Sequence, residues 1–298
     1  MDKQTWLEVS FTLPGEQAEA VAEILNRYAH QGVVIERDLK KRDKKLMKVF
    51  AYLEVNEKLE HNKQEIEKAV FYLDKILPVP APTYRMIRDQ NWMAAWKKFY
   101  TPLEVGQRLI IIPAWVENKH EFRIPICINP GMAFGTGTHP TTQLSLELLE
   151  KYVRAGSPMI DVGCGSGILS IAGILLGAAH SVAVDISQAA LRSIMENSIL
   201  NGVQDKIESG QASVREIRSG RFSISQAPLV VANILLNILK DLFDLGMGEL
   251  VSDQGLLLIA GVLTDQVKEI EEKALEKGFT RIEHITQGDW SGLAFQKN

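Results

Sequence analysis

Two glycine-rich stretches lie close together in the middle of this chain. The first is FGTGTHPTT, residues 134–142, and the second is MIDVGCGSG, residues 159–167. Glycines let the backbone approach a ligand closely, which a side chain would prevent. Neither stretch has the GK[ST] ending of a phosphate-binding loop, which excludes phosphoryl transfer by such a loop. We interpret the two stretches as parts of one binding site whose ligand is not held by its phosphates.

Two carboxylates accompany the second stretch. Asp161 precedes its first glycine by two residues, and Asp185 ends the run VAVD, 185 − 167 = 18 residues past Gly167. An acid in this place can accept both hydroxyls of an adenosine ribose. The glycine spacing is G-x-G-x-G, not the dinucleotide pattern G-x-G-x-x-G. Plainer alternatives stay open: a purely structural turn, a helix-capping Asp161, or an Asp185 that only ends a strand.

A polar residue also closes the apolar run LVVA. This residue is Asn233. Its amide oxygen, with nearby backbone carbonyls, can accept hydrogen bonds from an amine and hold that amine in line with a methyl donor. The alternative is that Asn233 is the N-cap of the helix that follows.

The elements that must position these residues follow from the hydrophobic pattern. From residue 139 onward, helices of ten or more residues alternate with buried strands. The expected helices are 139–153, 168–178, 187–202, 235–246 and 264–278, and the expected strands are 158–163, 180–186, 227–234, 255–263, 280–287 and 292–298. This alternation indicates a parallel, doubly wound sheet, which binds ligands at the carboxyl ends of its strands.

The first ninety residues have shorter elements. They predict strands and helices in the order β-α-β-β-α-β, the split βαβ or ferredoxin-like arrangement. The strands are 6–13, 32–37, 48–55 and 83–89, and the helices are 16–32 and 65–76.

Three further segments precede the first glycine stretch. Residues 37–48 carry seven basic and two acidic side chains, 7 − 2 = +5, which fits a solvated hairpin loop or a docking arm for an anionic partner such as an RNA-bearing particle. Residues 89–100 predict a helix with an aromatic stripe, which is more typical of core or domain packing than of a binding face. RLIIIPAW and FRIPICINP predict strands that lead to the first glycine stretch, so a domain junction is expected between residues 85 and 120.

Composition limits the class of protein. The 298 residues are 46% hydrophobic and 23% charged, and the net charge of −4 gives no global attraction to nucleic acid or membrane. Two cysteines, Cys127 and Cys164, are too few for a disulfide framework, and Cys164 stands where the turn needs a small residue, not a catalytic thiol. The opening MDKQTWLEVS does not resemble a signal peptide, and no apolar run approaches the length of a membrane span. A cytoplasmic location is therefore expected.

The longer strings carry a resemblance to a known family. NPGMAFGTGTHPTT, IDVGCGSGILSIA, VDI, NSILNGV and VVANIL together resemble the PrmA family, the bacterial methyltransferases of ribosomal protein L11, within the class I S-adenosylmethionine-dependent methyltransferases. The likeness covers about residues 120–298. It implies a Rossmann-like, seven-stranded α/β sheet preceded by a small ferredoxin-like α+β domain. The implied segments are a substrate-recognition domain (1–88), a linker helix with connecting strands (89–119) and the methyltransferase domain (120–298).

The resemblance also implies contacts with S-adenosylmethionine. Thr142 would contact its amino-acid part, Gly163 would present backbone to it, and Asp185 would hold its ribose hydroxyls. Asn233 would lie between the cofactor and the acceptor amine as the catalytic residue. The other implied contacts are Gly165 and the lid-like loop of Phe134, Gly135, Thr136, Gly137, Thr138 and His139.

The implied reaction is methylation of amines, at lysine side chains and an N-terminal amine, on ribosomal protein L11. The resemblance suggests several methyl groups on the same amines. We further expect a monomeric enzyme, no metal, no membrane and a contact with ribosomal RNA through the basic residues 37–48. Two alternatives stay open. One is an RNA or small-molecule methyltransferase on the same fold, although the chain lacks the D/N-P-P-[YFW] string of many base-amine methyltransferases. The other is a cofactor-binding ribosome assembly factor without catalysis.

Overall fold

The computed structural model of this protein describes most of the chain. The described residues are 6–29, 33–37, 46–75, 78–87, 101–118, 122–129 and 135–298. The chain divides into two compact units, residues 1–100 with 130–132 and residues 101–129 with 133–298. Most of the basic stretch, the predicted aromatic helix 89–100 and Phe134 lie outside the described residues. The three-segment organisation expected from the sequence stays a prediction.

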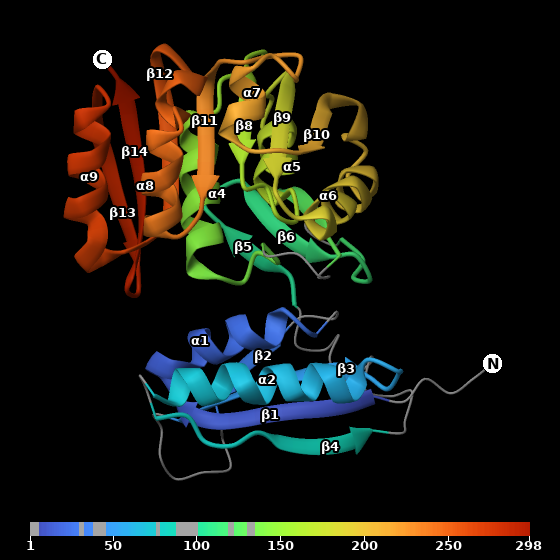
Figure 1. Cartoon of the computed structure of the whole chain (residues 1–298). Helices are drawn as coiled ribbons and strands as arrows, with labels where there is room; N and C mark the ends of the chain where they lie inside the picture. The colour runs from blue at the N-terminus through green and yellow to red at the C-terminus, as the bar shows by residue number, and fades with distance from the viewer. Residues whose placement is uncertain are drawn as a thin grey trace. The chain divides into compact units, whose positions relative to one another are not determined.

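The smaller unit is an antiparallel sheet with two helices on one face (Figure 1). Its strands have the order β2-β3-β1-β4, which confirms the predicted split βαβ arrangement. Its elements are β1 Trp6–Pro14, α1 Gly15–Asn26, β2 Val33–Arg37, β3 Leu46–Glu54, α2 Leu59–Asp74 and β4 Thr83–Ile87. Side chains alternate across β1, so Val9 and Phe11 pack under the helices while Glu8 points to the opposite face.

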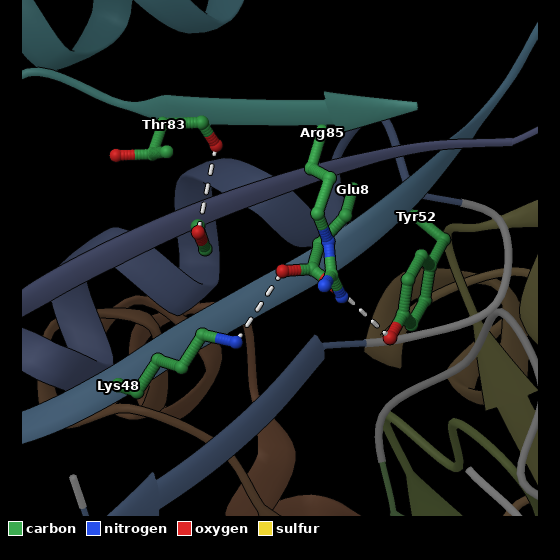
Figure 2. A network of polar contacts seen from close by, with 6 residues as sticks. Glu8, Lys48, Tyr52, Thr83 and Arg85 are labelled. Carbon is green, nitrogen blue, oxygen red and sulfur yellow. Dashed lines mark hydrogen bonds and ion pairs between the residues drawn. The ribbon is translucent and has the colours of Figure 1, made fainter. Parts of the chain in front are cut away.

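Glu8 is a buried carboxylate with three polar partners (Figure 2). Its side chain pairs with Lys48 Nζ at 3.3 Å and Arg85 Nη2 at 2.9 Å. The hydroxyl of Tyr52 also donates to Glu8, at 3.4 Å. A buried charge is costly unless it is paired and hydrogen-bonded, so this network lets β1 carry an acid in the middle of the sheet.

The larger unit is built on a seven-stranded sheet of order β10-β9-β8-β11-β12-β14-β13. The first five strands in that order are parallel, and β14 and β13 are antiparallel to their neighbours. The strands are β8 Pro158–Val162, β9 His180–Asp185, β10 Ile207–Gln211, β11 Ala227–Asn233, β12 Val251–Leu263, β13 Phe279–Gln287 and β14 Trp290–Lys297. The pattern of apolar residues predicted six of these strands and missed β10. The chain order reverses between β8 and β11, which is the switch point where such sheets bind ligands.

Helices cover both faces of this sheet (Figure 1). Ile160 and Val230 share a core with α7, α8 and α9, whereas the alternate residues Met159 and Val231 share a core with α4 and α5. The helices are α4 Pro140–Tyr152, α5 Ile168–Leu175, α6 Gln188–Leu200, α7 Val214–Arg218, α8 Leu236–Asp244 and α9 Val267–Glu276. Three 3₁₀ turns complete the connections: Gln204–Lys206, Met247–Leu250 and Thr264–Gln266.

A small three-stranded sheet packs on the α4 and α5 side of the larger unit. Its strands are β5 Leu103–Val105, β6 Leu109–Pro113 and β7 Ile124–Ile128. The sequence predicted β6 and β7 but not the three-residue β5. No helix within the described ranges is long and apolar enough to cross a membrane.

Candidate active site

The second glycine stretch forms the turn between β8 and α5. Gly163, Gly165 and Gly167 have φ values of 74°, 52° and 81°, in the left-handed region that favours glycine. A Cβ built on Gly163 would lie 2.6 Å from Cδ1 of Ile234, so close approach also requires glycine there. The backbone N–H of Gly163 donates to the carbonyl of Val184 at 2.8 Å, which ties the turn to the end of β9.

Asp185 lies directly beside this turn. Its Oδ2 accepts the N–H of Gly165 at 3.0 Å, and its Oδ1 accepts the N–H of Ser187 at 2.8 Å. Each carboxylate oxygen keeps a further lone pair, so the oriented group can still accept ligand hydroxyls. The next residue, Ile186, is 78% exposed and was not singled out from the sequence. Because Ile186 directly follows Asp185, its apolar side chain lies next to the carboxylate.

Asp161 is fully buried inside β8. Its Oδ2 accepts both the N–H of Ser170, at 3.1 Å, and the Ser170 hydroxyl, at 2.8 Å. Ser170 belongs to the first turn of α5, where N–H groups have no partner within the helix, so Asp161 does cap this helix, as one alternative proposed. Burial raises the pKa of Asp161 to about 7, although the bonds from Ser170 lower it.

Among the described residues of the larger unit, two buried side-chain oxygen atoms have no hydrogen-bond partner. They are Oδ1 of Asp161 and Oγ1 of Thr142, and both side chains are inaccessible to solvent. Leaving a buried polar atom unpaired costs about 1–3 kcal/mol. A ligand with donor groups, such as the ammonium of an amino acid, therefore fits the chemistry of these two residues.

The first glycine stretch meets the second one. The hydroxyl of Ser166, in the β8–α5 turn, donates to the carbonyl of Gly135 at 2.6 Å. A Cβ on Gly135 would lie 2.7 Å from that hydroxyl oxygen, so the contact needs glycine. Further along the loop, the hydroxyls of Thr136 and Thr138 lie 3.1 Å apart. The two stretches thus lie together, as the sequence predicted.

His139 is the N-cap of α4. Its Nδ1 accepts the N–H of Thr141 at 3.3 Å, and Pro140 occupies the first helical position, where the missing N–H costs nothing. The geometry agrees with the interpretation of His139 as a helix-start residue. Cys164 in the glycine turn is buried, and burial raises the pKa of its thiol well above the usual value, so it is not an activated nucleophile.

Two asparagines at the C-terminal end of α6, Asn197 and the C-cap Asn201, hold the β8–α5 turn and β7, although the sequence placed them only within the string NSILNGV and not in the site. Asn197 accepts the N–H of Asn129 at 2.9 Å and donates to the carbonyl of Ser166 at 2.9 Å. Asn201 accepts the N–H of Cys127 at 2.8 Å and donates to its carbonyl at 2.6 Å. The sequence signal that could have revealed these two asparagines is their spacing of four residues, which puts both amides on one face of the helix.

Asn233 ends β11 at the same edge of the sheet as the glycine turn. Its neighbour Ala232 pairs with Val162, the last residue of β8. The helix α8 begins at Leu236 with Leu235 as its N-cap and no side-chain capping bond. The alternative that Asn233 caps this helix is therefore wrong, and its amide lies at the edge where ligands bind.

These features define the class of the protein. When the strands of the seven-stranded sheet are numbered in chain order, the sheet order is 3-2-1-4-5-7-6, with a glycine turn after strand 1, an acid at the end of strand 2 and an asparagine at the end of strand 4. This is the Rossmann-like fold of the class I methyltransferases.

The comparisons identify the family within that class. The family model described as "Ribosomal protein L11 methyltransferase (PrmA)" matches residues 5–298. A relative of that name from Heliobacterium modesticaldum is 33% identical over 98% of this chain and 97% of its own length. Another, from Citrifermentans bemidjiense, is 36% identical over 98% of both chains. The crystal structure of a ribosomal protein L11 methylase from Lactobacillus delbrueckii subsp. bulgaricus is 31% identical, with a TM-score of 0.59 over 67% of this chain and 100% of that one. The chain belongs to the PrmA family.

Proposed function

We propose that this methyltransferase transfers methyl groups from S-adenosylmethionine to amines of ribosomal protein L11, at lysine side chains and the N-terminal amine. The relatives carry the name of that substrate. The observation that supports the site is the bond between Ser166 and Gly135, which joins two glycine loops next to the carboxylate of Asp185. The cofactor supplies an electrophilic methyl group on a sulfonium.

The proposed cofactor contacts follow the edge of the sheet. Asp185 holds the ribose hydroxyls, Ile186 offers an apolar surface to the base, and Gly163 and Gly165 let the backbone approach. Thr142 faces the amino-acid end, for which its unpaired hydroxyl is suited. Gly135, Thr138 and Phe134 belong to the loop that closes the site.

Asn233 is proposed to hold the acceptor amine. Its amide oxygen accepts a hydrogen bond from the amine and directs the nitrogen lone pair toward the methyl group. Such orientation can supply about 7–11 kcal/mol of the barrier. A lysine amine has a pKa of about 10.4 and must lose its proton before it attacks, and a partly desolvated pocket beside a positive charge favours that loss. We assign no general base, and water can carry the proton away.

The proposed function also assigns roles to the segments of the chain and to its contacts on the ribosome. Residues 1–88 act as the substrate-recognition domain, 89–119 as the connection and 120–298 as the methyltransferase domain. The basic stretch 37–48 contacts ribosomal RNA when the substrate is on the ribosome, because its local charge of 7 − 2 = +5 attracts the phosphates of the RNA although the chain as a whole carries −4. The enzyme works as a monomer in the cytoplasm.

The decisive experiment offers the full chain, with isotope-labelled S-adenosylmethionine, separately to L11 and to ribosomal RNA. Mass spectrometry should show L11 heavier by whole methyl groups, with no label in the RNA. Label in the RNA alone would support the RNA methyltransferase alternative. Cofactor binding without transfer to either would support the assembly factor. The Asp185→Asn variant controls for transfer by a contaminating enzyme.

A further inference from the structure

The C-terminal end of the first glycine loop is held by the last hairpin of the chain. Gln143 in α4 donates from Nε2 to the carbonyl of Thr138 at 3.0 Å. Gln287 in β13 donates in turn to Oε1 of Gln143, also at 3.0 Å. The rings of Trp290 and His139 meet edge to face, with centroids 5.0 Å apart and an interplanar angle of 68°. The hairpin thus reaches both Thr138 and His139.

The hairpin is itself firmly attached to the sheet. Trp290 opens β14, where it pairs with Gln287 of β13 and with Leu263 of β12. The N–H and the hydroxyl of Thr264 donate to the carbonyl of Asp289, in the hairpin turn, at 2.8 Å and 3.1 Å. Because β14 is antiparallel, its first residues lie at the edge where β12 ends. A support fixed in this way can transmit the rigidity of the sheet to the loop.

The loop needs support at both ends. Gly135 and Gly137 have φ values of 102° and 91°, and glycine loses more conformational entropy on ordering than any other residue. Ser166 fixes one end through the carbonyl of Gly135. Without a second anchor, the segment after Gly137 could sample conformations that leave the site open.

We propose that Gln287 and Trp290 are positioning residues that hold the first glycine loop closed over the cofactor. The inference rests on the proposed function, because cofactor binding by this loop is part of it. Both side chains act through other residues, Gln287 through Gln143 and Thr138, and Trp290 through His139. Substitution should therefore change cofactor affinity more than the rate of transfer.

The test compares hairpin variants of the full chain by calorimetry with S-adenosylmethionine. Trp290→Ala and Gln287→Ala should each raise the Kd about two- to tenfold, the range expected from one aromatic pair or one hydrogen bond. The KM for the cofactor should rise in parallel while kcat changes less. Trp290→Phe keeps an aromatic ring against His139 and should restore most of the affinity.

Gln296→Ala is the matched control. Gln296 lies on the same hairpin but donates to Oε1 of Gln254, at 3.4 Å, and not toward the loop. Its Kd should equal that of the wild type. Folded Gln287→Ala and Trp290→Ala proteins with wild-type Kd would overturn the inference, and if Trp290→Ala does not fold, Gln287→Ala decides alone. Asp185→Asn in the same assay separates the two proposals, because its unchanged affinity would reject the proposed cofactor site itself.

Discussion

Replacing Asp161 by asparagine should remove a pH dependence from the stability of the protein. Asp161 is fully buried, and its pKa is raised to about 7 by that burial, with a smaller contribution from the charge of Asp185. In an unfolded chain, aspartate titrates near pH 3.9. Between about pH 4 and pH 7, the folded state therefore keeps a proton that the unfolded state has released.

The sign and the size follow from this difference. Because the folded-state pKa is raised, the stabilising contribution is fully present below about pH 4 and is lost as the pH rises through about 7. A shift of about 3 pKa units, at about 1.4 kcal/mol each, corresponds to at most about 4 kcal/mol. Asparagine cannot titrate, so the variant lacks this contribution at every pH.

Urea unfolding of both proteins without cofactor, at several values between pH 4 and pH 8, measures the effect. The wild type should lose up to about 4 kcal/mol relative to Asp161→Asn over that range, since the other titrating groups are shared and cancel. Asp205→Asn, at an exposed carboxylate, controls for the loss of one charge. Parallel stability curves for the wild type and Asp161→Asn would refute the argument that burial of this carboxylate dominates its ionisation.

Three further substitutions test other parts of the structure. Asp185→Ala should weaken S-adenosylmethionine binding by more than about tenfold in calorimetry, because charge-assisted bonds to the ribose are lost; equal affinity would exclude the ribose role. Asn197→Ala should lower the free energy of unfolding by about 1–3 kcal/mol in urea titrations, since it leaves two backbone groups unpaired, and a stability equal to wild type would contradict this. Glu8→Gln should lower the free energy of unfolding by about 1–2 kcal/mol, less than for a fully buried pair, because the side chains of Lys48 and Arg85 are 30% and 69% exposed. That difference should shrink at high salt, and a salt-independent value would argue against an ion-pair origin.

The helices and strands that the sequence predicted are those whose apolar residues recur with a clear helical or strand-like spacing. The strand 158–162 and the helix 140–152 are bordered by turn residues and show clear patterns, and both lie where expected. Strand β10, IESGQ, was missed because it is a polar strand at the edge of the sheet, with neither alternation nor a continuous apolar run. Helix α2 begins at Leu59, six residues before the predicted start, because its first turns are mostly polar.

Site residues could be predicted from the sequence where their residue type and position have few purely structural explanations. Glycines at positive φ and the acid that ends β9 are examples, and the structure places them together. The link from Asn197 to Ser166 was not predictable, because the two residues are 31 apart and no local pattern joins them. The role of Asn233 was ambiguous for another reason: only two residues separate the end of β11 from the start of α8, and only the structure shows Leu235 as the N-cap.

The side chain of Asn201 also covers backbone groups on the edge strand β7. β7 borders its three-stranded sheet, and the outer side of such a border strand offers unpaired N–H and C=O groups that can template the addition of a foreign strand. The amide of Asn201 occupies both groups of Cys127 as a neighbouring strand would, and Asn197 occupies the N–H of Asn129. The C-terminal end of α6 thereby occupies hydrogen-bonding groups on the edge of β7. The protein limits edge-to-edge self-association at this strand without adding another strand.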